Sequence, residues 1–470
     1  MSSLISIKVL ALICDYSTKM TDLKALESAG LFDKNVPRYT SYPTAPHFHR
    51  DVGGPEFAFW LETLDTAKPV SLYIHIPFCE RLCWFCACRT QGVTTLSPVA
   101  AYIDVLLEEI AMFKATRPEG LKLGRLHFGG GSPTILSPDL IDTLMDAILD
   151  ATPFDTDYEF SVEIDPTACN DEKIEAFVRS GMNRASIGVQ DFNPKVQEAI
   201  GRPQSYELTR DTVESLRRHG VPSVNIDMVY GLPYQGLSEL KNTVELVQSL
   251  KPDRVALFGY AHVPWMAKRQ QMIPEKSLPG AHARFEQAET AAAMFAASGM
   301  DVIGIDHFAK PSDSLAVAAR NGHLRRNFQG YTDDRCIALI GLGASSISRF
   351  PQGYIQNNAA TTNYIKSIQS GDWSATKGFA LGMDDQVRAR AIEALMCDFE
   401  IDLAALEARY GDFAKPVKAD CKRLAKDYSE FASLKGNHFR ILPHGRPLTR
   451  IIAAGFDAFN APNHRHSSAI

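Results

Sequence analysis

No hydrophobic run in the sequence is long enough to cross a membrane. A bilayer-spanning helix needs about 20 consecutive apolar residues, and no stretch of the 470-residue chain approaches that length. The apolar stretch 4–14 is interrupted by Lys8 and lacks both a basic leader and a small-residue cleavage site, so we interpret it as a poor signal peptide. Met20 is an alternative start for the native protein. We therefore expect a cytoplasmic protein without a membrane partner.

The sequence also lacks an excess of positive charge. Its 55 Asp and Glu residues outnumber its 49 Lys and Arg residues, and the formal net charge is −6. This balance argues against nucleic acid as a partner, because phosphate backbones are bound by basic surfaces. An anionic substrate would need basic residues concentrated at one site. Apolar residues make up 45% of the chain and charged residues 22%, which is the composition of an ordinary globular protein.

Cysteines are few and unevenly placed. The chain has nine, an odd number, and four of them fall within residues 79–88. A disulfide framework uses an even number of cysteines at spread positions. The pattern instead predicts a thiolate-rich site in a reducing compartment.

The middle of the chain alternates β-type runs with helix-type segments. The expected strands, rich in Val, Ile, Phe and Tyr, are 70–76, 125–128, 158–164, 184–189, 224–229, 254–258 and 301–305. Repeated βα units predict an α/β fold with a parallel sheet and right-handed crossovers, either a barrel or a doubly wound sheet. Ligands bind at the carboxyl ends of the strands in both folds. Unusual residues follow these strands: Cys79, the glycines 129–131, Glu163 and Gln190.

The chain divides into three parts by composition. Residues 1–68 are rich in proline and aromatic side chains and show no repeat, residues 69–350 carry the βα units, and residues 351–470 indicate helices. In the last part, apolar residues at helical spacing form a stripe: Val387, Ala391, Leu395, Met396 and Phe399. We expect an N-terminal extension, a large catalytic domain and a helical C-terminal domain.

The most specific chemical feature is a run of closely spaced cysteines. Cys79, Cys83 and Cys86 are separated by three and two residues, and Cys88 follows them. Three thiolates on one loop can hold a cubane iron–sulfur cluster whose fourth iron has no protein ligand. A structural zinc site usually takes two cysteine pairs from separated positions and closes its fourth position. Zinc and incidental or reactive thiols are the alternative interpretations of this segment.

This spacing resembles the signature of the radical S-adenosylmethionine superfamily. There the open iron binds the amino and carboxylate groups of S-adenosylmethionine, and an electron from the cluster breaks a sulfur–carbon bond to leave a 5′-deoxyadenosyl radical. The aromatic Phe85 before the third ligand fits the pattern, and a core residue that shields the cluster is an equal interpretation. The glycine run 129–131 resembles the superfamily's glycine-rich motif, although such turns serve many ligands.

A narrower resemblance comes from motifs that follow one another along the chain. They are 37–43 (PRYTSYP), 73–79 (YIHIPFC), 188–192 (GVQDF), 225–233 (NIDMVYGLP), 306–308 (DHF) and 326–331 (RNFQGY). In this order they are similar to the oxygen-independent coproporphyrinogen III oxidase family. The resemblance implies an incomplete (β/α) barrel of parallel strands with an N-terminal extension and a helical C-terminal domain. It also implies a [4Fe–4S] cluster on the first three cysteines and two molecules of S-adenosylmethionine.

The resemblance further implies contacts to each S-adenosylmethionine. Those to the first, on the cluster, are Tyr73, Gly130, Glu163 and Ile347. Those to the second are Phe85, Gly131, Ser132, Gln190, Arg202, Asp227 and Ala261. Ser132 departs from the family's usual threonine but keeps the hydroxyl. By residue type, Glu163 suits an ammonium group, Arg202 a carboxylate and Asp227 ribose hydroxyls, while each alone would equally fit an ordinary polar residue.

The implied reaction is oxidative decarboxylation of two propionate side chains of coproporphyrinogen III to vinyl groups, which gives protoporphyrinogen IX in haem synthesis. The four substrate carboxylates need guanidinium groups, and Arg38 is the first candidate, with a surface arginine bracing its segment as the even alternative. Cys88 is expected near the reaction centre without binding the cluster. The implied partners are an electron donor of flavodoxin or ferredoxin type and an unknown acceptor. We expect a monomer.

Two other functions are alternatives. A haem-binding chaperone of the same superfamily resembles this enzyme, but those relatives lack the fourth cysteine and the N-terminal segment. Both are present here, as Cys88 and residues 38–43. A radical enzyme that acts on another substrate, such as a methyltransferase, would share the core motifs. The motifs together favour the oxidase.

Overall fold

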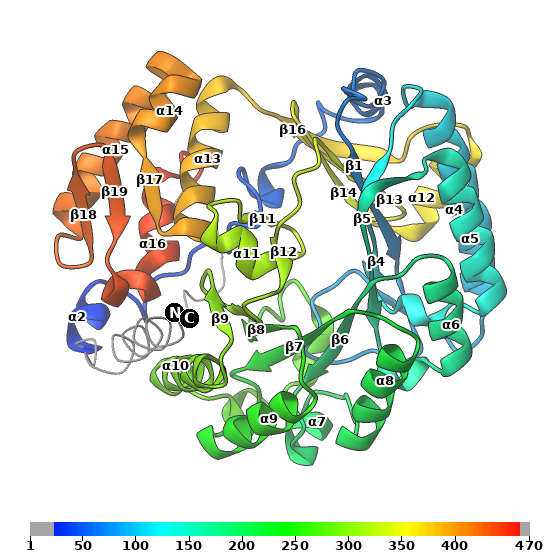
Figure 1. Ribbon diagram of the computed structural model, residues 1–470, viewed down its shortest axis with the longest axis horizontal. Coiled ribbons are helices and arrows are strands. Elements are labelled where there is room, and N and C mark those ends of the chain that lie inside the picture. The colour runs from blue at the N-terminus through cyan, green and yellow to red at the C-terminus, as the bar shows by residue number, and fades with distance from the viewer. Residues whose placement is uncertain (1–22, 461–470) are drawn as a thin grey trace, which may run out of the picture.

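A twelve-stranded sheet forms the centre of the molecule in the computed structural model, which describes residues 23–460 (Figure 1). Its strand order is β16-β15-β14-β13-β1-β4-β5-β6-β7-β8-β10-β9. Six neighbouring strands are parallel: β1 (Val70–Ile76), β4 (Leu123–Gly130), β5 (Phe154–Ile164), β6 (Arg184–Gln190), β7 (Ser223–Tyr230) and β8 (Arg254–Gly259). β13 (Leu339–Leu342) is parallel to β1 on its other side. The curved sheet ends at β16 and β9 without closing, so the fold is an incomplete (β/α) barrel.

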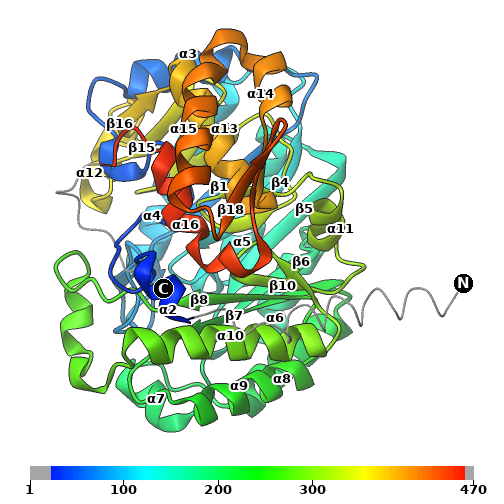
Figure 2. The same cartoon turned by 90° about the vertical axis from the view of Figure 1, so that its left-hand side faces the viewer.

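Helices lie along the outer side of the parallel strands, as Figures 1 and 2 show. They are α4 (Ser97–Thr116), α5 (Pro138–Ala151), α6 (Asp171–Arg179), α7 (Pro194–Ala199), α8 (Tyr206–Arg218), α9 (Leu237–Ser249) and α10 (Ala281–Ala297). Side chains cap the first turns of α5, α6, α7 and α8. Ser137 accepts a hydrogen bond from the Leu140 N–H at the start of α5, and Ser205 accepts one from the Leu208 N–H at the start of α8. The predicted alternation of strands and helices is confirmed through β8.

The seventh expected strand, 301–305, is not part of the parallel set. β9 (Asp301–Ile303) pairs antiparallel with β10 (His307–Ala309), and β10 pairs antiparallel with β8. Three residues join β9 to β10, whereas parallel neighbours need a crossover of about a dozen or more. The prediction of another βα unit there is wrong. β13 takes the remaining parallel position, after a hairpin formed by β11 (Arg325–Asn327) and β12 (Gly330–Thr332).

Strands continue past residue 350, where we expected helices to begin. β14 (Ile347–Phe350), β15 (Gly353–Asn357) and β16 (Ala375–Ala380) extend the central sheet with antiparallel pairing. α12 (Thr361–Gln369) lies between the last two strands in the chain and packs on α4. The central sheet therefore includes part of the segment that composition placed in the C-terminal domain.

The C-terminal unit contains helices and a small sheet. Its helices are α13 (Met383–Asp398), α14 (Leu403–Tyr410), α15 (Lys415–Asp427) and α16 (Thr449–Ala453). An antiparallel sheet accompanies them, in the order β17 (Glu400–Asp402), β19 (His438–Ile441) and β18 (Ala432–Lys435). The expected stripe on α13 is buried at Val387, Ala391, Leu395 and Met396. Phe399 ends this helix in the left-handed conformation. The sheet in this unit was not predicted from the sequence.

The N-terminal segment packs on the C-terminal unit. α2 (Leu23–Ser28) lies beside this unit in both ribbon views, and Leu26, Tyr39 and Tyr42 belong to the hydrophobic cluster that also contains the core of α13 and α15. Arg450 donates hydrogen bonds to the backbone carbonyls of residues 36 (2.6 Å) and 37 (3.1 Å). Both ends of the described chain therefore share one core, separate from the core beneath the parallel strands.

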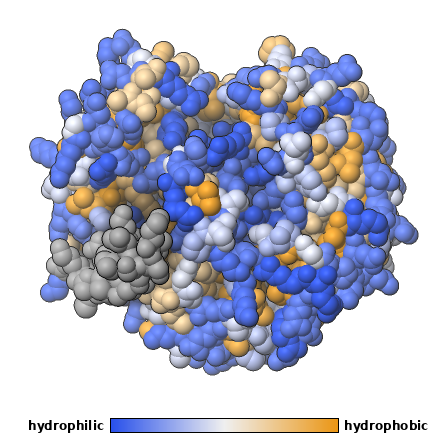
Figure 3. All heavy atoms as spheres, in the orientation of Figure 1, coloured by the Kyte–Doolittle hydropathy of each residue, from blue (hydrophilic) through white to orange (hydrophobic). Residues whose placement is uncertain are grey.

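Polar side chains cover most of the face shown in Figure 3, and hydrophobic residues form small patches on it. Within residues 23–460, no helix is both long enough and apolar enough to span a bilayer. The stretch 4–14 and Met20 lie outside the described residues.

Candidate active site at the strand ends

The clustered cysteines lie on one loop after β1. The loop begins at β2 (Phe78–Cys79), which pairs with β3 (Gln91–Gly92) at the other end of the loop. The Trp84 N–H donates to the carbonyl of Ile200 (2.8 Å) and fixes the middle of the loop against α7. Four free thiols are carried here: half-buried Cys79 and Cys86, buried Cys83 and exposed Cys88. The structure therefore places the predicted thiolate site at the carboxyl end of a barrel strand.

The surroundings of these thiols differ. Arg202 Nη1 donates to the Cys83 sulfur at 3.3 Å. The Cys88 thiol and the Cys88 N–H (3.4 Å) both hydrogen-bond to the Cys86 sulfur, and they lower the pKa of Cys86 to about 6. Burial, together with repulsion from the neighbouring thiolates of Cys86 and Cys83, raises the pKa of Cys79 to about 12.

This donor set fits an iron–sulfur cluster. Thiolates are the ligands of iron in such clusters, and Arg202 stabilises negative charge on Cys83 by a charge-assisted hydrogen bond. Cationic irons would also offset the repulsion that opposes ionisation of Cys79. Within the described residues, no three His, Cys, Asp or Glu side chains converge to hold a single metal ion. The thiolates of a cubane bind different irons, so they need not converge on one point.

The glycine run is tied to the strand that precedes the cysteine loop. Gly131 N–H donates to the Ile76 carbonyl, and Ser132 N–H donates to the Phe78 carbonyl, both at 2.8 Å. Gly130 has a φ of +109°, and a Cβ there would overlap the imidazole ring of His75. The sequence therefore needs glycine at position 130 for both backbone conformation and space.

Glu163 closes one side of this turn. Its Oε2 accepts a hydrogen bond from Gly130 N–H at 3.2 Å, and its Oε1 lies 3.3 Å from His127 Nε2. The His127 ring stacks on Tyr73, with ring centroids 5.7 Å apart. Tyr73 pairs with Gly341 of β13, and a Cβ on Gly341 would lie 2.9 Å from the Ile347 carbonyl oxygen. The four residues expected around the first S-adenosylmethionine therefore lie within five adjacent strands of the sheet, from β14 to β5.

A second group of polar side chains surrounds Arg202. Arg202 Nη2 donates to the Gly188 carbonyl at 2.8 Å, and Nη1 lies 3.5 Å from Asp165. Although burial opposes it, the guanidinium group lowers the pKa of Asp165. Gln190 adopts a φ of +67°, and its Nε2 lies 2.9 Å from the position that a Cβ on Gly188 would occupy. Gln190 and Arg202 therefore meet over the end of β6.

Asp227 lies on the neighbouring strand β7. It accepts hydrogen bonds from Ser186 Oγ (3.0 Å) and Asn225 Nδ2 (2.8 Å). Burial raises the pKa of Asp227. On the other side of the loop, Gln270 Nε2 donates to the carbonyls of Phe85 (2.8 Å) and Ala261 (3.1 Å). One amide thus holds together two of the residues expected at the second S-adenosylmethionine.

Ser132 and Arg38 also reach the strand ends. Ser132 is buried, and its hydroxyl lies 2.9 Å from that of Thr134. Arg38 Nη2 donates to the Gly259 carbonyl at the end of β8 at 2.6 Å. Arg38 is therefore a half-buried side chain that joins the N-terminal segment to the barrel.

Sequence reasoning missed several residues of this site. His127 and Asp165 contact expected residues, Gln270 bridges two of them, and Arg269 Nη2 donates to the Cys88 carbonyl (3.1 Å) and Thr90 Oγ1 (2.8 Å). The available signal was position for Asp165, which directly follows β5 at the end where ligands bind, whereas His127 lies inside β4. Arg269 and Gln270 lie in a short 3-10 turn without such a signal.

Comparisons with known proteins agree with this geometry. Residues 73–247 match the Radical SAM superfamily. An oxygen-independent coproporphyrinogen III oxidase of Cereibacter sphaeroides is 55% identical over 451 residues, which cover 96% of this chain and 100% of the relative. One from Paracoccus denitrificans is 50% identical over the same shares of the two chains.

A solved structure matches across the whole fold. It is the coproporphyrinogen III oxidase HemN of Escherichia coli, a radical SAM enzyme, with a TM-score of 0.86 and 34% identity. The match covers 91% of this chain and 100% of that one. The chain therefore belongs to the oxygen-independent coproporphyrinogen III oxidase family of the radical SAM superfamily.

Proposed function

We propose that the cysteine loop, the glycine turn and the residues around Arg202 form the active site of an oxygen-independent coproporphyrinogen III oxidase. The observation that carries this proposal is their convergence at the carboxyl ends of the barrel strands, within a chain that belongs to this family. The reaction converts two propionate groups of coproporphyrinogen III to vinyl groups and yields protoporphyrinogen IX.

Three cysteines would hold a [4Fe–4S] cluster: Cys79, Cys83 and Cys86. When bound, this cluster and S-adenosylmethionine supply a carbon radical that can take a hydrogen atom from an unactivated C–H bond. Arg202 stabilises the thiolate of Cys83, and the backbone of residue 88 stabilises that of Cys86. Cys88 stays off the iron, because a fourth thiolate would close the position that S-adenosylmethionine needs.

Two molecules of S-adenosylmethionine would lie beside this loop. Glu163, oriented by the Gly130 N–H, can accept hydrogen bonds from the ammonium group of the first, with Tyr73 and Ile347 nearby. The second would be bound by the set around Arg202: Phe85, Gly131, Ser132, Gln190, Arg202, Asp227 and Ala261. Arg202 suits a carboxylate, and Asp227 suits ribose hydroxyls.

The substrate chemistry needs a radical because the propionate β C–H bond has no useful acidity. Loss of a hydrogen atom from the β-carbon, cleavage of the bond to the carboxylate with release of CO2, and transfer of one electron to an acceptor leave a vinyl group. Arg38, held at the end of β8, would bind a propionate carboxylate. Cys88, next to the cluster ligand Cys86, would act near the substrate.

The chemistry of the reaction implies an electron donor, an electron acceptor and a reducing compartment. A low-potential donor of flavodoxin or ferredoxin type would reduce the cluster, and an unknown acceptor would take the substrate electron. Free cysteines at every described position suit the reducing cytoplasm. We further propose a monomer with three parts: an N-terminal extension at 1–68, a partial barrel that begins at residue 69 and includes β15 and β16, and a C-terminal unit that begins after β16.

An anaerobic assay tests this function. The purified protein should be brown with about four irons per chain, and with reductant, S-adenosylmethionine and an electron acceptor it should convert coproporphyrinogen III to protoporphyrinogen IX. Changing Cys79, Cys83 or Cys86 to Ala should remove the iron. Stoichiometric zinc in a colourless protein would refute the assignment of an iron–sulfur cluster. Tight haem binding without any effect on the porphyrinogen would favour a haem chaperone.

A further inference from the structure

Arginines from three separate elements meet at the carboxyl end of β8. Arg38 comes from the N-terminal segment and Arg284 from α10, and they donate to the adjacent carbonyls of Gly259 (2.6 Å) and Tyr260 (2.8 Å). Arg326, on β11, acts electrostatically on Arg38. We call Arg38, Arg284 and Arg326 the arginine cluster. The cluster lies beside the carboxyl end of a barrel strand, and folds of this kind bind their ligands at those ends.

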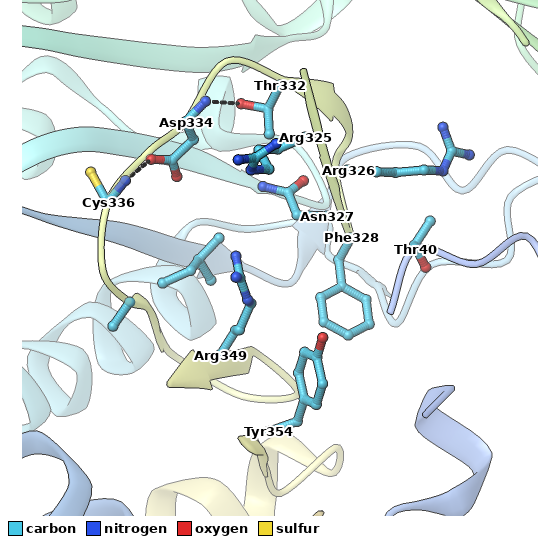
Figure 4. Close-up of a pocket in the computed structure, with 12 residues that line it drawn as sticks. Thr40, Arg325, Arg326, Asn327, Phe328, Thr332, Asp334, Cys336, Arg349 and Tyr354 are labelled. Atoms are coloured by element: carbon cyan, nitrogen blue, oxygen red, sulfur yellow. Dashed lines mark hydrogen bonds between the residues drawn. The ribbon is translucent and has the colours of Figure 1, made fainter. Parts of the chain in front are cut away.

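Arg326 has unused hydrogen-bonding capacity. Its side chain is only 4% exposed, and its buried Nε and Nη1 have no hydrogen-bond partner among residues 23–460. Asp306 Oδ1 lies 3.8 Å from Nη1, which is too long for a hydrogen bond, and this carboxylate already contacts His307 Nδ1 at 2.7 Å. Figure 4 shows the Arg326 side chain pointing away from Arg325 and toward the side where Thr40 lies.

Positive charge exceeds negative charge around the cluster. Asp306 is the carboxylate whose charge acts on Arg38, Arg326 and the nearby Arg450. Burial lowers the pKa of Arg38 and of Arg284, and in each case a neighbouring guanidinium group lowers it further. A further anion would therefore stabilise the guanidinium groups of Arg38 and Arg284. For Arg326, burial is outweighed by Tyr331 and Asp306, which raise its pKa.

We propose that the arginine cluster binds propionate carboxylates of the tetrapyrrole substrate and so sets the orientation of its ring at the barrel mouth. This inference rests on the proposed function and adds Arg284 and Arg326 as binding residues. A guanidinium group is a strong donor to carboxylates, and Arg326 has two buried nitrogens, Nε and Nη1, whose N–H groups have no partner among the described residues. Three such groups on different elements would distinguish a polycarboxylate from a neutral tetrapyrrole.

Binding of coproporphyrin III to the anaerobic holoenzyme tests the proposal. This oxidised porphyrin is fluorescent and carries the same four propionates, and its tetramethyl ester is a neutral comparison. The variants are Arg326→Gln and Arg284→Gln. The matched control is Arg325→Gln, which removes the same charge from the adjacent residue of β11, whose side chain points to the other side of the hairpin.

We expect each test variant to weaken coproporphyrin III binding about tenfold or more, which is about 1.4 kcal/mol, because a charged hydrogen bond to the substrate is lost. Arg325→Gln should bind coproporphyrin III as the wild type does. The tetramethyl ester should bind equally weakly to the wild type and to all three variants. S-adenosylmethionine affinity and its cleavage without substrate should stay unchanged. Unchanged porphyrin binding in both test variants would overturn the proposal.

Two further outcomes are distinguishable. A parallel loss of S-adenosylmethionine affinity would overturn the proposal by assigning the cluster to the carboxylate of that molecule. A wild type that neither binds the porphyrin nor converts coproporphyrinogen III would overturn the proposed function itself. If Arg326→Gln does not fold, the proposal is tested with Arg284→Gln and with the charge-preserving Arg326→Lys. Unchanged porphyrin binding by Arg284→Gln would then count against a binding role for the arginine cluster.

Discussion

Four cysteines share one loop, yet their neighbours give them different chemistry. Cys83 is buried beneath a guanidinium group, whereas Cys88 is exposed and its carbonyl accepts a hydrogen bond from Arg269. The sequence spacing predicted the loop as a cluster site. It could not predict Arg269, because this side chain reaches the loop from a segment some 180 residues further along the chain.

Changing Cys88 to Ser should separate cluster binding from turnover. The variant should keep its iron and cleave S-adenosylmethionine, because three other thiolates bind the cluster. It should lose vinyl formation by about 100-fold or more if Cys88 moves a proton in the reaction, as positioned acids and bases contribute that much. Iron content, 5′-deoxyadenosine and protoporphyrinogen are measured in one incubation. Loss of all iron would refute the non-ligand role and leave the enzyme assignment standing.

Glu109 is a buried carboxyl group away from the site. It accepts hydrogen bonds from Gly343 N–H (2.6 Å), Tyr364 Oη (2.8 Å) and Asn357 Nδ2 (2.8 Å). Burial raises the pKa of Glu109 to about 7. The folded protein therefore binds the Glu109 proton more tightly than the unfolded chain does. The contribution of protonated Glu109 to the free energy of unfolding is complete below about pH 4.3 and is lost as the pH rises through about 7.

Glu109→Gln should remove this pH dependence. Between pH 5 and pH 8, the free energy of unfolding of the wild type should fall relative to the variant by about 2–3 kcal/mol. Denaturant unfolding of both proteins at several pH values measures the difference. A difference between the two proteins that does not change with pH would show that Glu109 has an ordinary pKa.

At the scale of elements, the strand β4 ends in a turn that only glycine can form. Gly130→Ala should disrupt S-adenosylmethionine binding, because the methyl group would overlap the His75 ring and displace the N–H that orients Glu163. Gly120→Ala, just before the same strand, is the matched control. It also has a positive φ, but nothing lies within 4 Å of its Cβ position, so it should cost only about 1–2 kcal/mol of stability.

Equilibrium binding of S-adenosylmethionine and thermal unfolding compare these two variants. Equal effects on cofactor binding would mean that backbone strain alone, rather than the close approach to His75, makes glycine necessary at position 130. Loss of S-adenosylmethionine binding in Gly130→Ala alone would support the role of this turn in binding the cofactor.

The elements of the barrel were largely predictable because their periodicity is local. The expected strand 70–76 coincides with β1, and the others lie inside the observed strands through β8. The failure at 301–305 has a physical cause, since a tight turn reverses the chain after β9 and inserts the antiparallel strand β10 between β9 and β8. β13 is only four residues long and gives too short a signal.

The site was predictable to a similar degree. Cysteine spacing and the glycine run identified the loop and the turn, and the family resemblance supplied Glu163, Arg202 and Asp227 as candidates. Asp227 and Arg202 have hydrogen-bond partners on the strand β6, and the 3-10 turn at Gln270 reaches the carbonyls of Phe85 and Ala261. Contacts between distant segments leave no local pattern in the sequence.

At the scale of the whole molecule, Arg450 connects the two ends of the chain. It lies on α16 and donates to the carbonyls of Val36 and Pro37, just before Arg38. Arg450→Met should free the N-terminal segment, because two backbone carbonyls lose a charged donor at a cost of about 1–3 kcal/mol. Porphyrinogen turnover should fall while S-adenosylmethionine cleavage continues.

Limited trypsin digestion measures this release through cleavage after Lys34 and Arg38. Arg440→Gln is the control, since this exposed arginine pairs with Glu400 in the same unit and does not touch the segment. Equal digestion rates in Arg450→Met and the wild type would show that the hydrophobic cluster alone holds the N-terminal segment.

The enzyme is expected to take a hydrogen atom from the β-carbon of a substrate propionate. An isotope experiment measures this transfer with the anaerobic holoenzyme, reductant, acceptor and coproporphyrinogen III deuterated at those carbons. We expect deuterium in the 5′-deoxyadenosine, and two CO2 and one protoporphyrinogen IX per substrate. Unlabelled 5′-deoxyadenosine alongside normal product, or labelled porphyrinogen recovered unchanged while a verified cluster cleaves S-adenosylmethionine, would contradict this expectation.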